Sequence, residues 1–222
     1  MIIEFNGLPG TGKTTVGKEL NKVFLEKGYT CFFSYNIPKN IIARYISYIF
    51  DGSLYLYYLG LIFAKKLTGS FRKENLQIPL ILVYFYQMYK NFQYYNPHKV
   101  LIIDQGIVQG IISIAHTDKM AEDKSLKKIF NFFSKKGISL YSVNCLCDVE
   151  LSKERIRGRN TTGGRLDVVS DDELIKALDV QAENFDFIRN CANDLFKCVD
   201  IDTAISPELN AVKIFEFIEA EK

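Results

Sequence analysis

The sequence predicts an α/β protein in which a parallel sheet is covered by helices on both faces. Three observations lead to this fold class. Short β-rich runs alternate with segments of helical periodicity along the chain. A glycine-rich turn, residues 7–12, joins the first β-rich run to the first helical segment. Hydrophobic residues make up 48% of the 222 residues, which is enough for a large buried core. We expect a single domain spanning residues 1–222.

The β-rich runs and the helix signals give the elements in order. Strands are predicted at Ile2–Asn6, Tyr29–Tyr35, Val100–Ile103, Ile138–Cys147 and Phe196–Ile201. The first helix places Val16, Leu20 and Phe24 on one face, and Gly28 ends it. Ser170 and Glu173 form a capping-box pattern at the start of a later helix, and Ser206-Pro207 opens the last one.

The stretch between the second and third strands, about residues 37–98, is too long for a simple crossover. It predicts two or three helices inserted over one edge of the sheet. Ten of the 13 tyrosines lie between Tyr45 and Tyr95. Tyr84, Met88, Phe92 and Tyr95 recur at helical spacing, which is typical of a packed core or a homodimer face. The same aromatic side chains could instead stack on the base or sugar of a substrate.

Charge and targeting signals exclude several classes of protein. The formal net charge of +2, from 28 basic and 26 acidic residues, argues against a nucleic-acid partner, which usually needs a basic stripe. The five cysteines include no C-x-x-C pair and are expected to be buried, reduced thiols. No secretory signal precedes the first strand, so we expect a cytoplasmic location. The most apolar run, Leu54–Ala64, is too short for stable membrane insertion and predicts a buried helix.

The glycine-rich turn matches G-x-x-x-x-G-K-[ST] at every fixed position, from Gly7 to Thr14. Such a turn gathers backbone N–H groups into one concavity, and the following helix adds its positive N-terminal end. We therefore predict that a nucleoside triphosphate and Mg²⁺ bind here. Lys13 would reach the β- and γ-phosphates, and the Thr14 hydroxyl would bind Mg²⁺. The predicted nucleotide-binding residues of the turn are Gly7, Gly10, Thr11, Gly12, Lys13, Thr14 and Thr15.

Three missing patterns argue against nucleotide hydrolysis as the main event. No N-K-x-D run follows a later strand to recognise guanine. Asp104, after the third strand, is followed by Gln105, where an ATPase that activates water usually carries glutamate. An L-S-G-G-Q run is also missing.

Asp104 directly follows the apolar run of the third strand. It should therefore lie at the carboxyl edge of the sheet, facing the phosphate-binding turn. There it could hold Mg²⁺, or it could take a proton from an acceptor hydroxyl.

Three arginines follow the fourth strand. On a helix, Arg155 and Arg159 lie one turn apart and share a face, whereas Arg157 points elsewhere. The next residues include the glycine pair Gly163-Gly164 and a further arginine, Arg165. This pattern predicts a short lid, about residues 155–170, that brings arginines to a transferring phosphoryl group.

Together these residues resemble the P-loop kinase superfamily, which includes nucleoside monophosphate kinases, thymidylate kinases and related small-molecule kinases. The resemblance covers the chain in order: the glycine-rich motif, Asp104, the arginine pair and the lid. It implies a three-layer P-loop NTPase fold with a five-stranded parallel sheet in the order 2-3-1-4-5. It also implies that Arg155 lies near adenine, that Arg159 lies near the transferring phosphoryl group, and that residues 202–204 pass the base.

The chain departs from the thymidylate-kinase-like pattern in two places. That pattern has Asp-Arg after the third strand, where this chain has Asp104-Gln105-Gly106. The usual acidic-Arg-Pro run after the second strand is replaced by residues 35–39, Tyr-Asn-Ile-Pro-Lys. Both departures weaken the case for a nucleoside monophosphate acceptor. Replacement cations could come from Lys39, Arg44, Arg72 or Lys73.

The leading hypothesis is an ATP- and Mg²⁺-dependent kinase that acts on a small-molecule acceptor, which could be a nucleotide, a nucleoside or another hydroxyl or phosphate compound. Its predicted catalytic residues are Lys13, Asp104, Arg159 and Arg165, with Thr14 and Asp104 at the metal and Arg155 at the nucleotide. A nucleotide-binding regulatory or assembly protein with slow or no phosphoryl transfer is the main alternative. An NTPase that acts on nucleic acid is a weaker one, because the net charge disfavours it.

Overall fold

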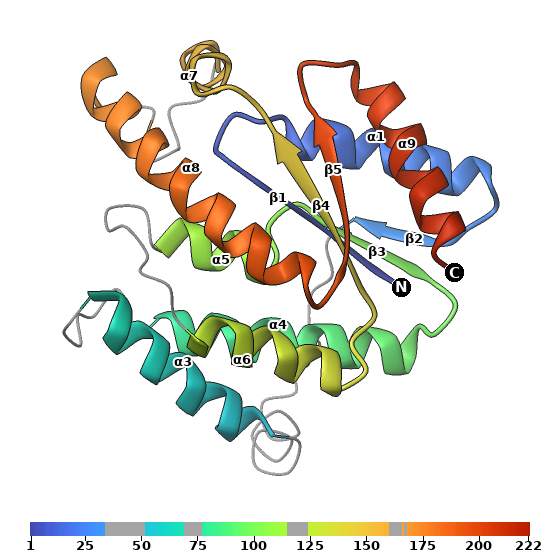
Figure 1. The fold of residues 1–222 in the computed structure, drawn as a ribbon. Coiled ribbons are helices and arrows are strands. Elements are labelled where there is room, and N and C mark those ends of the chain that lie inside the picture. The colour runs from blue at the N-terminus through green and yellow to red at the C-terminus, as the bar shows by residue number, and fades with distance from the viewer. Residues whose placement is uncertain (34–51, 69–76, 115–123, 160–165, 167) are drawn as a thin grey trace.

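The computed structural model of the chain describes residues 1–33, 52–68, 77–114, 124–159, 166 and 168–222. Five strands in this part of the chain form one parallel sheet in the order β2-β3-β1-β4-β5 (Figure 1). They span Ile2–Gly7 (β1), Cys31–Phe33 (β2), Val100–Ile103 (β3), Leu140–Leu146 (β4) and Lys197–Asp202 (β5). The order 2-3-1-4-5 is thus confirmed.

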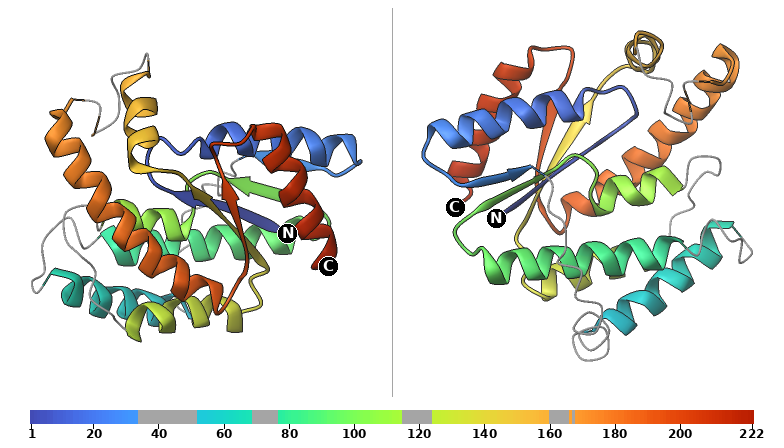
Figure 2. Two further views of the ribbon diagram at one scale, coloured as in Figure 1. Left: turned by 45° about the horizontal axis from the view of Figure 1, so that its top comes forward. Right: turned by 180° about the vertical axis from the view of Figure 1, so that it is seen from behind.

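Helices cover both faces of the sheet, as predicted. They span Lys13–Glu26 (α1), Ser53–Thr68 (α3), Gln77–Tyr95 (α4), Ile107–Ile114 (α5), Lys124–Lys135 (α6), Val149–Arg157 (α7), Asp171–Asn193 (α8) and Pro207–Ala220 (α9). Figure 2 shows α1 and α9 on one face and α4, α5, α6 and α8 on the other, with α3 outside α4 and α6. No described helix combines the length and apolar character that crossing a bilayer requires.

The alternation of side chains along β1 divides the core between the two faces. Ile3 and Phe5 point toward α1 and α9, where they pack with Leu20 and Ile214. Ile2 points the other way, into a larger cluster that includes residues of α3, α4, α5, α6 and α8. Because β1 is the central strand and is buried on both faces, the loop that follows it opens at the middle of the carboxyl edge.

The predicted helical insert between the second and third strands is confirmed, but the packing of its described helices differs from the prediction. Its described part contains α3 and α4, and α4 packs on a face of the sheet through residues in the same cluster as Leu101 and Ile103 of β3. The run Leu54–Ala64 lies in α3 and is not a fully buried helix, because Leu54 and Tyr58 are 58% and 59% exposed. A second layer of helix needs only one apolar face, so α3 buries Leu56, Leu59, Phe63 and Ala64 and leaves the rest of its surface in solvent.

The aromatic stripe predicted along α4 is only partly a packing surface. Met88 and Phe92 are buried, whereas Tyr84 and Tyr95 are exposed. The tyrosines that enter the core are Tyr86 and Tyr89, which form edge-to-face contacts with Phe133 of α6. The face of α4 that packs into the core is therefore the one that carries Tyr86 and Tyr89, next to the predicted stripe.

The predicted helix boundaries at Ser170, Ser206 and Gly28 are confirmed. The Ser170 hydroxyl accepts from the Glu173 amide, and the Glu173 carboxylate accepts from the Ser170 amide at 3.1 Å. The Ser206 hydroxyl accepts from the Leu209 amide at 3.3 Å, and Pro207 begins α9. Gly28 has a φ of 85° directly after the end of α1. Strand β2 is described only at Cys31–Phe33, and residues 34 and 35 of the predicted strand lie outside the described residues.

A buried carboxyl group on β1 holds the start of α5. The Glu4 side chain is fully buried, and its Oε1 accepts from the Val108 amide at 2.6 Å. Its Oε2 accepts from the Tyr89 hydroxyl of α4 at 2.9 Å. A Cβ at position 106 would lie 2.0 Å from Glu4 Cδ, so only glycine fits directly before α5. Glu4 thus fixes the first turn of the helix that follows Asp104.

Burial raises the pKa of Glu4 from 4.5 to about 7, although the hydrogen bonds from Tyr89 and Val108 oppose this shift. The folded state then binds the proton more tightly than the unfolded state. The free energy of unfolding should therefore fall as the pH rises from about 4.5 to about 7.

We predict that Glu4→Gln removes this dependence, since glutamine keeps the shape but does not titrate. The stability of the wild type relative to the variant should fall by about 3 kcal/mol across that pH window. Urea denaturation of both proteins at a series of pH values measures the difference. Glu173→Gln is the control of opposite sign. Ser170 lowers the pKa of Glu173, so the stability that its charged form gives is lost only as the pH falls below 4.5 and should not change from pH 4.5 to 7. A wild-type to Glu4→Gln difference that does not change with pH contradicts the prediction.

Candidate active site

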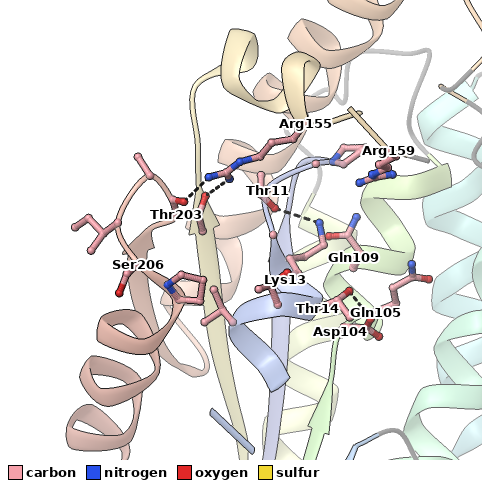
Figure 3. Close-up of a pocket in the computed structure, with 18 residues that line it drawn as sticks. Thr11, Lys13, Thr14, Asp104, Gln105, Gln109, Arg155, Arg159, Thr203 and Ser206 are labelled. Atoms are coloured by element: carbon pink, nitrogen blue, oxygen red, sulfur yellow. Dashed lines mark hydrogen bonds between the residues drawn. The ribbon is translucent and has the colours of Figure 1, made fainter. Parts of the chain in front are cut away.

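A cavity of about 860 Å³ opens at the carboxyl edge of the sheet, between the loop after β1, the start of α5, the end of α7 and the loop after β5 (Figure 3). Ligand pockets of this size hold molecules as large as nucleotides. It is lined by Pro9, Gly10, Thr11, Gly12, Lys13, Thr14, Thr15, Val16, Asp104, Gln105, Gln109, Arg155, Arg159, Thr203, Ala204, Ile205, Ser206 and Pro207. All the predicted site residues that the structure describes, except Gly7, are in this set.

The loop after β1 is packed closely against α7 and is held by hydrogen bonds of its own residues. Gly10 has a φ of 86°, and a Cβ there would lie 2.5 Å from the Ser152 carbonyl oxygen of α7. Thr11 is buried, and its hydroxyl donates to the Leu8 carbonyl at 2.9 Å. Gly12 caps α1, with its carbonyl accepting from the Thr15 and Val16 amides at 3.0 Å. This close fit fixes the loop backbone and turns the positive end of α1 toward the cavity.

Lys13 extends back over the loop. Its Nζ donates to the carbonyl oxygens of Gly7 and Leu8 at 2.9 and 2.7 Å, and to the Thr11 hydroxyl at 3.3 Å. Burial, together with the smaller effect of the positive charge of Arg159, lowers the pKa of Lys13 to about 8. An anion beside this ammonium would therefore be held strongly, because it relieves both effects.

Thr14 and Asp104 meet at the floor of the cavity. Thr14 is in the first turn of α1, and its hydroxyl donates to Asp104 Oδ2 at 2.9 Å. The sequence placed Asp104 at this edge because it follows β3, and the structure brings it to the loop as expected. A hydroxyl and a carboxylate are oxygen ligands of the kind that Mg²⁺ uses together with phosphate oxygens. Within the described ranges, no three or more His, Cys, Asp or Glu side chains gather into a site that would hold a metal ion by itself.

Two arginines face the cavity and one turns away. Arg155 Nη2 donates to the Thr203 carbonyl at 2.7 Å, which joins α7 to the loop after β5. Arg159 lines the opposite part of the cavity, beyond the end of α7. Arg157 forms an ion pair with Asp171 at 2.9 Å and is directed toward α8, as the spacing predicted. Arg165 lies outside the described residues, as do Lys39, Arg44, Arg72 and Lys73.

The helix itself differs from the prediction that placed Arg155 and Arg159 on one helical face. Helix α7 ends at Arg157, and the Arg159 amide donates to the Ile156 carbonyl at 3.3 Å in a tighter turn. The chain thus brings Arg159 to the cavity through the turn at Gly158.

Sequence reasoning missed two residues that shape the site. Gln109, on the first turn of α5, is 6% exposed and accepts from the Gly7 amide through Oε1 at 3.0 Å. Glu4 fixes that turn from below through Val108. Glu4 left a signal in the sequence, since it is the one charged residue of an otherwise apolar run in the first strand. Gln109 left none, because a polar residue near a helix start is usually a surface residue.

Comparisons of the sequence with protein-family models give no match. Comparisons with curated protein sequences also give none. Solved structures do match. Deoxyadenosine kinase from M. mycoides with the products dCMP and a flexible dCDP aligns over 100% of both chains, with a TM-score of 0.50 and 12% identity.

Two further structures of that enzyme also align with 99% of this chain and 100% of theirs. The complex with dATP has a TM-score of 0.51 and 14% identity, and the complex with dCTP has 0.52 and 13%. The chain therefore has the fold of a P-loop kinase, the fold that its motifs resemble.

Proposed function

We propose that this protein transfers the γ-phosphoryl group of ATP, with Mg²⁺, to a hydroxyl group of a nucleoside or a closely related small molecule. One observation carries the proposal: the phosphate-binding loop, the Thr14–Asp104 pair and two arginines all face one cavity. Arg159, across the cavity from the loop, is placed where it would stabilise a transferring phosphoryl group.

The loop would bind the triphosphate through its backbone amides and the N-terminus of α1. Lys13 would turn from the Gly7 and Leu8 carbonyls to the β- and γ-phosphates. Arg155 and Thr203 are joined by a hydrogen bond on the side of the cavity formed by the loop after β5. This side is lined by Ala204 and Ile205 as well, and it would hold the base of ATP.

The reaction forms a bond between the acceptor oxygen and the γ-phosphorus, breaks the bond between that phosphorus and the oxygen of ADP, and releases the hydroxyl proton. Lys13 and Arg159 would stabilise the negative charge on the transferring group. Asp104 is placed either to take the proton or to hold the metal with Thr14. The Mg²⁺ ion, when bound, neutralises part of the phosphate charge. Arg165 of the lid would add a further cation on closure.

A nucleoside fits this cavity better than a nucleoside monophosphate. The residue after Asp104 is the neutral Gln105, and it lines the cavity where the thymidylate-kinase-like pattern has a phosphate-binding arginine. Among the described residues that line the cavity, the cations are Lys13, Arg155 and Arg159, all placed around the proposed nucleotide side. The neighbours described as deoxyadenosine kinase have the same fold and support a nucleoside acceptor.

The proposal is tested by ADP release from ATP and Mg²⁺ in the presence of separate acceptors: nucleosides, deoxynucleosides, nucleoside monophosphates, sugars and antibiotics. We expect turnover that depends on a nucleoside or deoxynucleoside. Turnover with a monophosphate alone would reject the acceptor class. Hydrolysis equal across the whole panel, or no turnover with tight ATP binding, would instead favour the regulatory or assembly alternative.

Asp104→Asn should lower kcat by at least about a hundredfold while ATP binding is largely kept. The amide is similar in size, but it neither takes a proton nor binds Mg²⁺ well. Steady-state kinetics and calorimetry with Mg-ATP measure the two effects. Gln93→Glu, on the exposed end of α4, serves as a control for an unrelated change of charge. Near-normal turnover of Asp104→Asn would remove Asp104 from the chemistry.

Nucleotide binding should take up a proton at about pH 9 and not at about pH 7. The pKa of Lys13 is about 8 in the free protein, so the lysine is mostly neutral at the higher pH, and a phosphate beside it restores the charge. Affinity for Mg-ADP should therefore fall as the pH rises above about 8. Calorimetry in buffers of different ionisation enthalpy measures the proton. Lys13→Arg is the matched control, because arginine stays charged throughout. Equal proton uptake by both proteins would show that another group is responsible.

A further inference from the structure

Gln109 is held in an unusual way for a buried glutamine. Its side-chain oxygen is occupied, because Oε1 accepts from the Gly7 amide at 3.0 Å. Within the described part of the chain, Nε2 donates to no protein acceptor, although the side chain is only 6% exposed. The residue lines the same cavity as Lys13, Asp104 and Arg159. An amide fixed through its oxygen has little freedom to turn its nitrogen away from that cavity.

Gln109 and Lys13 both form hydrogen bonds with the backbone of Gly7. Gln109 binds the Gly7 amide, and the Lys13 ammonium donates to the Gly7 carbonyl at 2.9 Å. Both side chains therefore end beside the first residue of the phosphate-binding motif. Figure 3 shows Gln109 reaching into the part of the cavity that Lys13 occupies, on the side toward Arg159. A phosphoryl group held by Lys13 and Arg159 would lie within reach of the Gln109 amide.

The first turn of α5 is rigid enough to hold such a donor in place. Val108, the neighbour of Gln109, donates its amide to the buried Glu4 at 2.6 Å. The Gly110 amide donates to the Gly106 carbonyl at 2.8 Å, and Glu4 fills the space above Gly106. A donor fixed before the reaction begins needs no reorganisation as charge develops, which is the condition under which one hydrogen bond aids catalysis most.

A neutral donor also suits the charge of this site. Lys13 and Arg159 already repel each other through the cavity. A third cation beside them would weaken the protonated form of Lys13 further, whereas an amide adds a hydrogen bond without adding charge.

We propose that Gln109 is a further catalytic residue, whose Nε2 donates a hydrogen bond to the transferring γ-phosphoryl group while its Oε1 holds the Gly7 amide. This assignment rests on the proposed function. It predicts that the Gln109 amide binds the phosphoryl group more strongly in the transition state than in bound ATP.

The test compares the affinities for Mg-ADP and for Mg-ADP with tetrafluoroaluminate, an analogue of the transferring phosphoryl group. In Gln109→Leu, the affinity for Mg-ADP should stay within about threefold of the wild type, and the extra affinity for the analogue should fall by about a hundredfold. With a productive acceptor, kcat should fall by a similar factor and KM for ATP should change little.

Gln109→Glu separates catalysis from support of the loop. Glutamate keeps the oxygen that accepts from Gly7 but replaces the donor, so it should fold, bind Mg-ADP and still lose the extra affinity for the analogue. Gln87→Leu is the matched control. Gln87 is 2% exposed and donates to the Ser53 hydroxyl at 2.7 Å, between α4 and α3 and away from the cavity. Its ratio of analogue to ADP affinity should equal that of the wild type.

Two outcomes overturn the assignment. One is a wild-type ratio in Gln109→Leu, which would mean that the amide does not contact the phosphoryl group. The other is a loss in Gln109→Leu that Gln109→Glu restores, which would leave Gln109 as a support of Gly7 alone. The analogue reports on the amide even if no acceptor supports turnover. Failure of the proposed function and failure of this inference can thus be told apart.

Discussion

The backbone of Gly7 is the point on which the rest of the site depends. It is the last residue of the central strand, and it is in register with Cys145 of β4. Its amide is bound by Gln109 of α5, and its carbonyl accepts from Lys13 of α1. One residue therefore joins the sheet to the helices on its two faces. Because β4, Gln109 and Lys13 hold the backbone of Gly7, the loop that follows it begins at a fixed position. The position of the loop, and with it the shape of the cavity, is therefore set by contacts with the buried core.

Among the described residues that line the cavity, positive side chains outnumber negative ones. Lys13, Arg155 and Arg159 face one cavity, and burial together with Arg159 lowers the pKa of Lys13. Asp104 opposes that effect. Glu4 of β1 points toward the face of the sheet that α4 and α5 cover. Its partners there are Tyr89 and the first turn of α5. The cations are thus left available to an anion, whereas the buried acid serves the structure of α5.

The parts of the site that sequence could predict are those fixed by local rules. The motif from Gly7 to Thr14 specifies its own conformation, and parallel strands end at one edge, which places Asp104 beside Thr14. The parts that it missed depend on contacts between distant segments. The role of Gln109 arises from a bond to Gly7, 102 positions away in the chain, and that of Glu4 from helices that follow much later. No pattern near either residue encodes those partners.

The errors in the predicted helices have a similar origin. Helical periodicity identified α3 and α4, but it could not show that α3 forms an outer layer, which leaves Leu54 and Tyr58 exposed. It also extended α7 to Arg159, although the helix ends at Arg157 and a tighter turn follows. In both cases the sequence defined the element, and the packing around it determined its limits and its exposed face.

The insert and the loop after β1 are connected through a short chain of buried hydrogen bonds. Tyr89 belongs to α4, a helix of the insert, and its hydroxyl donates to Glu4. Glu4 in turn accepts from Val108, and the next residue, Gln109, binds the loop at Gly7. Helix α4 of the insert thus supports the turn that carries Gln109. Because buried hydrogen bonds of this kind are costly to break, they hold α4 and the start of α5 together. Glu4 of β1 is therefore a structural link between α4 of the insert and the turn of α5 that lines the cavity.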